Sequence, residues 1–329
     1  MYHEQILQLL RESGGYISGE EMSRRLGITR SAVWKVIRAL REQGYQIDSS
    51  TRLGYRLVSG PDILSAAEIR AVLGPHPWLE NLVVLPEVDS TNNYLRKLAA
   101  AGAPAGTVVT AGMQTGGRGR QGRSFDSPAG LGVYFSVLLR LHTPPEAISH
   151  LTEAVAVAAC DALEAAAGLR PGIKWTNDLI LQDRKLGGIL TELSLELESG
   201  QTDYVVVGIG INCAQTPEQF PEEVRPMAVS LQMAAGHPVH RSAVVAELMR
   251  SLSGMADTLL PEKDRWLERY RADCITLGRE VRVLRNGTVR QGRAEGLDPG
   301  GALLITWEDG SREAVFSGEV SVRGLYGYV

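Results

Sequence analysis

Residues 112–123 restrict the fold of this chain more than any other part of its sequence. The segment contains five glycines and three arginines, Arg118, Arg120 and Arg123. Glycine adopts positive φ without a steric penalty and lets a backbone approach a ligand closely. Guanidinium groups are permanently charged and match the geometry of carboxylates and phosphates. The segment predicts a cationic loop that closes over an anionic ligand; taken alone, it also fits a solvated surface turn.

Within this segment, residues 117–122 match the G-x-G-x-x-G dinucleotide fingerprint. That fingerprint needs a strand before it and a helix that begins inside it. Residues 108–111 read as a strand, but Pro128, Gly130 and an apolar run over residues 131–141 come next. This order predicts another strand where a helix is required, so the context disfavours a Rossmann domain.

Length and composition indicate a globular protein of two or three domains. The chain has 329 residues, of which 44% are hydrophobic and 22% are charged. Its cysteines, Cys160, Cys213 and Cys274, are far apart, and its six histidines show no metal-ligand spacing. This pattern favours reduced thiols over structural zinc or disulfides. Because no signal-like N-terminus or stretch of ~18 apolar residues occurs, we expect a cytoplasmic protein.

The first 60 residues are basic, with nine Lys/Arg against six Asp/Glu, whereas the rest holds 25 against 32. Residues 3–11 have helical periodicity, Ser18 begins a capping box, and Thr29 is placed to cap a third helix. Residues 45–49 and 52–57 read as a hairpin. Three helices, a hairpin and positive charge predict a winged helix-turn-helix that binds DNA.

Several polar residues lie off the apolar stripe of the third helix or in the hairpin, where they can reach bases and phosphates. They are Arg30, Ser31, Lys35, Arg38 and Arg52. We expect Trp34 to pack in the core of the module or against a helix, and not to stack on a base. A helical cap domain with an ordinary charged face is the alternative.

Pro61-Asp62 marks a boundary, and a mixed α/β region follows. A strand over residues 82–88 leads into a helix that Ser90 is placed to cap. Free N–H groups at this helix start, together with Thr91 and Asn92, suit a polar ligand. Capping alone is an equally good account of Ser90.

A second polar cluster follows on short strands over residues 173–190, and a return strand covers residues 204–211. Lys174, Asp178 and Lys185 converge on the region that faces the cationic loop if the sheet is continuous. From about residue 278 the pattern changes to short alternating strands separated by turns, which predicts a small SH3-like barrel.

Six motifs together resemble one known family in both type and order. They are Asp89-Ser-Thr-Asn92, Gln114 with the Gly-Arg-Gly-Arg-x-Gly-Arg loop, Ser127-Pro128 with Tyr134-Phe135-Ser136, Lys174-Trp-x-Asn-Asp178, Lys185-Leu-x-Gly188-Ile-Leu, and Gly208-x-Gly-Ile-Asn212. Over nearly its whole length the chain resembles the bacterial biotin protein ligases of the bifunctional kind, which also act as the biotin operon repressor.

The resemblance implies an α+β chain of three domains. A winged helix-turn-helix would cover residues 1–62, and a catalytic domain of the class II synthetase-like biotin/lipoate ligase type residues 63–276. An SH3-like domain would cover residues 277–329 and help to bind ATP and the acceptor, with a purely structural cap as the alternative.

The resemblance also implies which residues bind the ligands. The biotin and adenylate site would be lined by Ser90, Thr91, Asn92, Gln114, Arg118, Gly119, Arg120 and Lys185. Gly187 and Gly188 would let the backbone approach the biotin ring, and Asn212 would contact the nucleotide. The chain departs from the family pattern at Phe125, where Trp is common, and at Thr176, where Pro is common.

The family reaction has two steps. The carboxylate of biotin attacks the α-phosphorus of ATP to give biotinyl-5′-AMP, and a lysine of the biotin carboxyl carrier protein then displaces AMP. Arg118, Arg120, Lys185 and Mg²⁺ would offset the repulsion between the two anions. Asp178 would orient or deprotonate the lysine, with a Mg²⁺ ligand or a turn brace as alternatives.

A repressor of this family implies operator DNA as a partner and a homodimer when loaded with biotinyl-AMP. Three other functions remain as alternatives: a non-catalytic transcription factor that senses a ligand, a redox repressor with a Rossmann domain, and a ligase for lipoate or octanoate. The charge density of the loop disfavours the first, and the strand expected after residue 122 disfavours the second.

Overall fold

A computed structural model describes residues 2–196, 198–285, 287–316 and 319–322. The chain forms two compact units, Met1–Ile63 and Leu64–Val329. None of the described helices combines the length and the apolar character needed to cross a bilayer.

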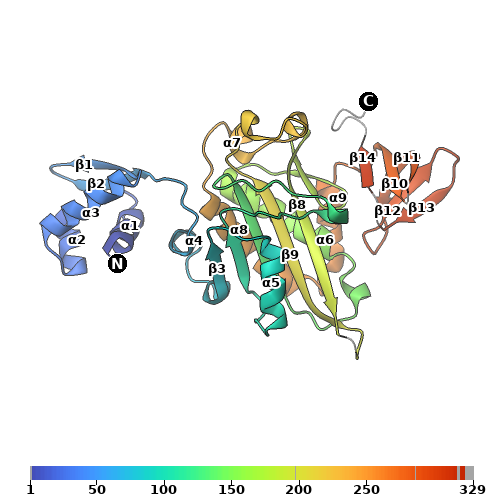
Figure 1. The fold of residues 1–329 in the computed structure, drawn as a ribbon, viewed down its shortest axis with the longest axis horizontal. Coiled ribbons are helices and arrows are strands. Elements are labelled where there is room, and N and C mark those ends of the chain that lie inside the picture. Colours follow the sequence, from blue (N-terminus) through green and yellow to red (C-terminus); the bar gives the residue numbers. More distant parts are fainter. Residues whose placement is uncertain (1, 197, 286, 317–318, 323–329) are drawn as a thin grey trace. The chain divides into compact units, whose positions relative to one another are not determined.

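The first unit has the expected helix-turn-helix and wing (Figure 1). Its elements are α1 Tyr2–Glu12, α2 Gly19–Leu26, α3 Arg30–Glu42, β1 Gln46–Ser50 and β2 Gly54–Ser59. Both predicted N-caps are present: Ser18 Oγ accepts from the N–H of Glu21 at 3.1 Å, and Thr29 Oγ1 accepts from that of Ala32 at 3.2 Å. The two strands pair in antiparallel register.

A core position for Trp34, one of the two predicted, is wrong. The buried stripe of α3 consists of Val33, Ile37 and Leu40, whereas Trp34 is 51% exposed. The guanidinium of Arg38, one turn along the helix, lies 5.4 Å from the centroid of the indole ring. The module therefore presents an aromatic side chain on the same helix as its cations.

The second unit is built on a seven-stranded sheet in the order β3-β4-β5-β9-β8-β7-β6. Only β3 and β4 pair in parallel; the other described pairs are antiparallel. The strands are β3 Leu82–Leu85, β4 Val108–Ala111, β5 Gly132–Leu139, β6 Gly172–Lys174, β7 Asp178–Leu181, β8 Arg184–Leu195 and β9 Thr202–Asn212.

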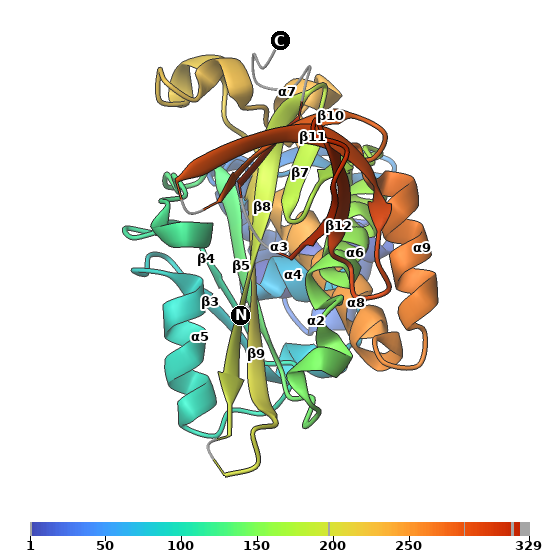
Figure 2. The same cartoon turned by 90° about the vertical axis from the view of Figure 1, so that its right-hand side faces the viewer.

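Helices cover both faces of this sheet (Figure 2). One face packs α5 in a small apolar cluster that includes Leu95, Leu138 and Val206. The main core lies on the other face, where α6 and α8 pack. The helices are α4 Ala66–Leu73, α5 Thr91–Ala100, α6 Leu151–Ala167, α7 Leu231–Ala235, α8 Arg241–Thr258 and α9 Lys263–Asp273. The central strands are buried on both faces, which explains their nearly continuous apolar sequences.

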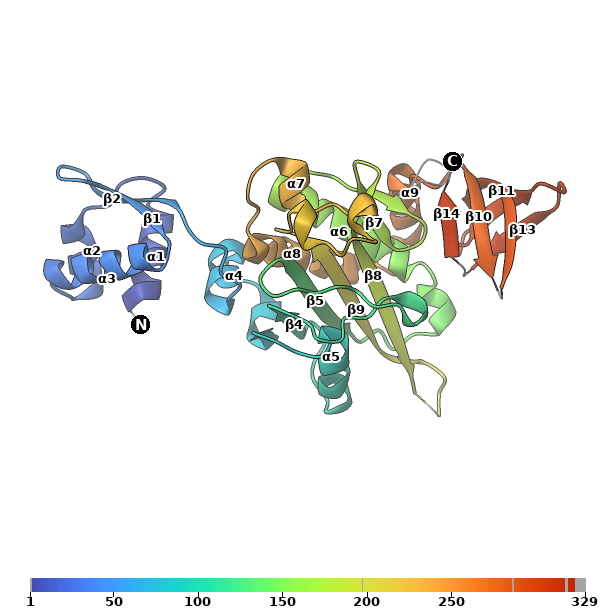
Figure 3. The ribbon, with the colours of Figure 1, turned by 45° about the horizontal axis from the view of Figure 1, so that its top comes forward.

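The C-terminal strands form a five-stranded antiparallel sheet in the order β13-β12-β11-β10-β14 (Figure 3). They are β10 Glu280–Arg285, β11 Thr288–Leu297, β12 Leu303–Trp307, β13 Arg312–Val315 and β14 Glu319–Val322. Their buried residues belong to the same apolar cluster as α6 and α8. Residues 323–329 of the predicted C-terminal domain lie outside the described residues.

Two local expectations are resolved by the structure. After the glycine-rich loop the chain enters β5, as the sequence predicted; a short 3-10 turn, Arg120–Gly122, is the sole helical element that the described chain has there. Ser90 occupies the N-cap position of α5, but its side chain makes no capping hydrogen bond. Capping therefore does not explain this serine.

Candidate functional site

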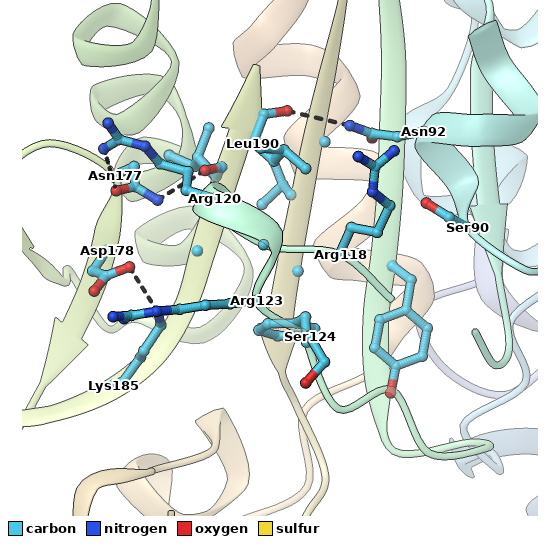
Figure 4. Close-up of a pocket in the computed structure, with 18 of the residues that line it drawn as sticks. Ser90, Asn92, Arg118, Arg120, Arg123, Ser124, Asn177, Asp178, Lys185 and Leu190 are labelled. Carbon is cyan, nitrogen blue, oxygen red and sulfur yellow. Dashed lines mark hydrogen bonds and ion pairs between the residues drawn. The ribbon is translucent and has the colours of Figure 1, made fainter. Parts of the chain in front are cut away.

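A cavity opens where the cationic loop crosses the seven-stranded sheet (Figure 4). It is lined by the start of α5, the loop, and strands β5 to β9. Of the predicted ligand-binding and catalytic residues, those that line it are Ser90, Thr91, Asn92, Gln114, Arg118, Gly119, Arg120, Asp178, Lys185 and Gly188. The cavity brings together motifs that extend from Ser90 to Gly210 in the sequence.

The loop folds back on itself as a small irregular hairpin. Arg118 and Ser124 form a β-bridge, Phe125 donates its N–H to Gly117 O at 2.9 Å, and Gly119 donates to Arg123 O at 2.7 Å. A Cβ on Gly117 would overlap the carbonyl oxygen of Phe125. Glycine at this position is therefore required by the return of the chain, which presents the arginines toward the sheet.

Each of the two central arginines contacts a side chain from another element. Arg118 Nη1 donates to Asn93 Oδ1 on α5 at 3.1 Å and lies 3.5 Å from Glu192 Oε1 on β8. Arg120 Nη1 donates to Asn177 Oδ1 at 3.0 Å. The loop is thus anchored on both sides of the cavity, and both guanidinium groups are held by side chains of the protein.

A second cationic group lies on β6 to β8. Lys185 Nζ donates to Asp178 Oδ1 at 2.7 Å, and Lys174 Nζ lies 3.8 Å from the other oxygen of Asp178. One carboxylate between two lysines leaves a net positive charge at this side of the cavity. Lys185 remains 39% exposed, so its ammonium group is accessible to a ligand.

Neutral polar groups form the opposite side. Gln114 Oε1 accepts from the N–H of Thr91 at 2.9 Å and from its hydroxyl at 3.1 Å, and thereby takes the capping role expected of Ser90. Ser136 Oγ donates to Asn92 Oδ1 at 2.6 Å, and Asn92 Nδ2 donates to Glu192 Oε2 at 2.8 Å. This network fixes the side chains of Thr91 and Asn92.

Glycines on β8 and β9 allow close approach, but not all at the predicted positions. Gly188 lines the cavity, whereas Gly187 does not. A Cβ on Gly187 would overlap Gly210 O, so glycine there allows the neighbouring strand to lie close. Sequence reasoning did not assign Gly208 and Gly210, which also line the cavity. A Cβ on Gly208 would overlap the Asn92 amide, and one on Gly210 would lie 2.7 Å from the Phe125 ring.

Asn212 also lies outside the lining residues. Its Nδ2 donates to the carbonyls of Val229 at 3.1 Å and Lys185 at 3.3 Å, so the amide holds the end of β9 against its neighbours. The predicted contact with the nucleotide remains a prediction. Asn177 lies within one of the quoted motifs and Asn93 directly follows another, but their contacts with Arg120 and Arg118 were not predicted because the partners are on distant elements. No sequence signal pointed to Glu192.

The predicted DNA-contacting residues form an exposed set on the first unit. Arg30, Ser31, Lys35 and Arg38 on α3 and Arg52 in the wing are all exposed. Arg38 pairs with Glu42 at 3.3 Å, with both side chains more than 60% exposed. Such a pair is weak and leaves the cation available to a phosphate.

Family models match all three parts of the chain. The model described as "Biotin/lipoate A/B protein ligase family" matches residues 84–212, that described as "HTH domain" matches residues 3–56, and that described as "Biotin protein ligase C terminal domain" matches residues 276–323.

Whole-length relatives agree with these matches. The chain is 36% identical over 324 residues to "Bifunctional ligase/repressor BirA" of Bacillus subtilis, with 96% of this chain and 97% of the relative covered. It is 32% identical to the protein of the same name from Escherichia coli, with 95% of each covered. Among solved structures, a biotin protein ligase from Aquifex aeolicus in complex with biotin and ATP is 32% identical, with a TM-score of 0.62, 74% of this chain and 99% of that one covered.

Proposed function

The chain belongs to the family of bifunctional biotin protein ligases and repressors, and from that premise we propose how its cavity and its winged helix work together. It is a biotin protein ligase and a DNA-binding repressor. We place biotin and ATP in the cavity beneath the cationic loop. The observation that carries this assignment is the convergence of Arg118, Arg120 and Lys185 on one cavity.

In the first step, a carboxylate oxygen of biotin forms a bond to the α-phosphorus of ATP, and the bond to pyrophosphate breaks. Two unit charges at ~4 Å repel by about 4 kcal/mol at an effective dielectric of 20. The two arginines and Lys185 offset this repulsion because they already hold their positions through contacts with the protein. No nucleophilic side chain is needed.

In the second step, the amine of an acceptor lysine forms an amide with biotin as the bond to AMP breaks. The amine must first lose a proton. We assign Asp178 to orient this lysine or to accept its proton, since among the described residues it is the carboxylate that lines the cavity. An Asp178→Asn variant should transfer biotin slowly from preformed adenylate, and transfer at the wild-type rate would remove this role. The acceptor is the biotin carboxyl carrier protein.

The described residues do not form a metal site on their own. Asp178 is the sole carboxylate among the described residues that line the cavity, and it already pairs with Lys185 and Lys174. No cluster of three or more His, Cys, Asp or Glu side chains suited to a metal occurs in the described part of the chain. Mg²⁺ commonly binds through substrate phosphates. We therefore place Mg²⁺ on ATP and assign no step to it.

The loop would also retain the adenylate, which hydrolyses readily in water and needs a site that excludes solvent. Arg120 joins the loop to Asn177 across the cavity. We expect Arg120→Gly to release biotinyl-AMP and to label bystander lysines, as measured by filter retention and by mass spectrometry of an added carrier protein. Retention at the wild-type level would contradict this role.

The adenylate also serves as the corepressor in our proposal. Its binding would order the loops of the second unit and create a surface for homodimerisation, so that two winged helices reach a palindromic operator. Gel shifts with operator DNA should show tighter binding when biotin and ATP are both present. Equal affinity with and without them would refute this coupling.

A ligation assay tests the function as a whole. Purified chain, biotin, ATP and a biotin carboxyl carrier protein should give a carrier with biotin on one lysine. Absence of that product, or an equal yield with lipoate in place of biotin, would overturn the assignment.

A further inference from the structure

Helix α6 buries one acidic side chain for which the reaction gives no role. Among the buried residues of α6, all of them described, Glu153 alone carries a charge. The residue is 4% exposed. Its Oε1 accepts from the hydroxyl of Thr176 at 3.2 Å, and its Oε2 has no hydrogen-bond partner in the described structure. Burial raises the pKa of this carboxyl to about 7.

Groups from three elements face Glu153. Arg120 of the cationic loop lowers its pKa and Asp298 of the β11–β12 loop raises it. Tyr270 of α9 lies beside it and is neutral, because burial raises its pKa well above the usual range. The backbone of Gly301 comes so close that a Cβ there would lie 2.9 Å from Glu153 Oε1. Glu153 therefore lies where α6, α9 and the C-terminal sheet meet.

A short chain of contacts joins this carboxyl to the cavity. Thr176, which accepts at its carbonyl from the Tyr270 hydroxyl at 3.2 Å, is followed directly by Asn177. Asn177 Nδ2 donates to Ile189 O on β8 at 2.9 Å, and Asn177 Oδ1 accepts from Arg120. Thr176 is not among the residues that line the cavity. The Thr176 hydroxyl therefore lies outside the cavity, on the residue next to the one that binds Arg120.

This arrangement lowers stability, because a buried carboxyl with an unpartnered oxygen is unfavourable. An apolar residue at position 153 would continue the rest of the buried face of α6. Destabilising ionisable groups of this kind cluster at functional sites. Thr176, which donates this hydrogen bond, is also one of the two positions at which the chain departs from the family pattern.

We propose that Glu153 and Thr176 form a positioning pair that sets Asn177 and Arg120, so that the ionised carboxylate holds the loop closed over the adenylate. The inference rests on the proposed site for biotinyl-AMP. Ionised Glu153 attracts Arg120 and stabilises the Thr176 hydrogen bond, whereas the neutral acid does neither. Closure of the cavity therefore weakens as the pH falls through about 7.

The test is the rate at which the full-length chain releases labelled biotinyl-AMP between pH 6 and pH 8.5. Wild type should release the adenylate roughly fivefold more slowly at high pH than at low pH, at the lower end of typical couplings between sites. Glu153→Gln should release it at the fast rate throughout. The matched control Glu146→Gln, an exposed carboxylate just before α6, should follow wild type.

Two variants at Thr176 test the same pair without touching the carboxyl. Thr176→Ser keeps the hydroxyl and should keep the wild-type profile. Thr176→Val removes the donor that lowers the pKa of Glu153 and should move the midpoint to higher pH. A flat wild-type profile, or a Glu153→Gln profile parallel to that of wild type, would overturn the inference. Failure of wild type to form any adenylate would instead overturn the proposed function.

Discussion

The two units hold their positive charges in different ways. In the cavity, three cations each have a partner from another part of the chain: Arg118 with Asn93, Arg120 with Asn177, and Lys185 with Asp178. On α3, Arg30 and Lys35 make no ion pair with any described residue, and Arg38 pairs with an exposed glutamate one turn away. A small anion of fixed shape needs charge that is already in position, whereas a phosphate backbone needs exposed charge that can adjust.

The largest effect should come from a cation of the cavity. Lys185→Ala removes a held ammonium group and leaves Asp178 with Lys174 alone, so we expect kcat/KM for adenylation to fall roughly 100- to 1000-fold. Arg184→Ala is the matched control, since that side chain contacts Gln182 and does not line the cavity. A loss below tenfold for Lys185→Ala would show that its charge need not be held in position.

The next largest effect concerns stability: the variant that should lose its hold on the adenylate should have a higher free energy of unfolding. The pKa of Glu153 is about 7 in the folded chain and near 4.5 in the unfolded chain. Between these pH values the folded chain keeps a proton on Glu153 that the unfolded chain has lost. The free energy of unfolding therefore falls as the pH rises from 5 to 7. Glu153→Gln removes this loss. We expect it to raise the free energy of unfolding by about 2 to 3 kcal/mol at pH 8 and by little at pH 5.

Chemical denaturation of the full-length chain, wild type and Glu153→Gln, at pH 5 and pH 8 measures this difference in the free energy of unfolding. A variant that is more stable yet releases adenylate faster cannot owe its defect to poor folding. Equal stabilisation at pH 5 and pH 8 would contradict the ionisation of Glu153.

A third prediction concerns the exposed aromatic residue of α3. Because Trp34 is half-exposed, Trp34→Ala should change the free energy of unfolding by less than about 1 kcal/mol, against roughly 3 to 5 kcal/mol for a core aromatic residue. Operator affinity should fall by about 1 to 2 kcal/mol, since apolar side chains on a recognition helix contact thymine methyl groups. Quenching of Trp34 fluorescence on operator binding measures the contact, and its absence would place the residue off the DNA.

The smallest effect should come from a single surface cation. Lys35→Ala should reduce the slope of log affinity against log salt by about 1 and leave adenylation unchanged. Arg312→Ala, an exposed arginine of the C-terminal sheet, should change neither. An unchanged slope for Lys35→Ala would exclude a phosphate contact. A change in adenylation would show that the cations of α3 and those of the cavity do not act separately.

Local sequence rules predicted most of the fold. The caps at Ser18 and Thr29, the helix after Ser90 and the strand after the glycine-rich loop follow from signals within a few residues of each element. The core position of Trp34 was predicted wrongly for a different reason. Val33, Ile37 and Leu40 already form the buried face of α3, and helical periodicity alone does not show whether a neighbouring aromatic residue is buried with them.

The site was only partly predictable for a different reason. The Gly-Arg loop and the lysine cluster are dense enough in charge to stand out in the sequence, and both line the cavity. The partners that hold them depend on sheet register: Glu192 and Gly208 reach Asn92 only because β8 and β9 pair beside β5. Glu153 looked like an ordinary helix residue until its burial was known.

Isotope exchange between pyrophosphate and ATP tests the central claim most directly, because it reports the first step without acceptor or DNA. The account predicts exchange that depends on biotin, does not occur with lipoate, and is lost in Lys185→Ala but not in Arg184→Ala. Exchange without biotin, equal exchange with lipoate, or full exchange in Lys185→Ala would contradict it.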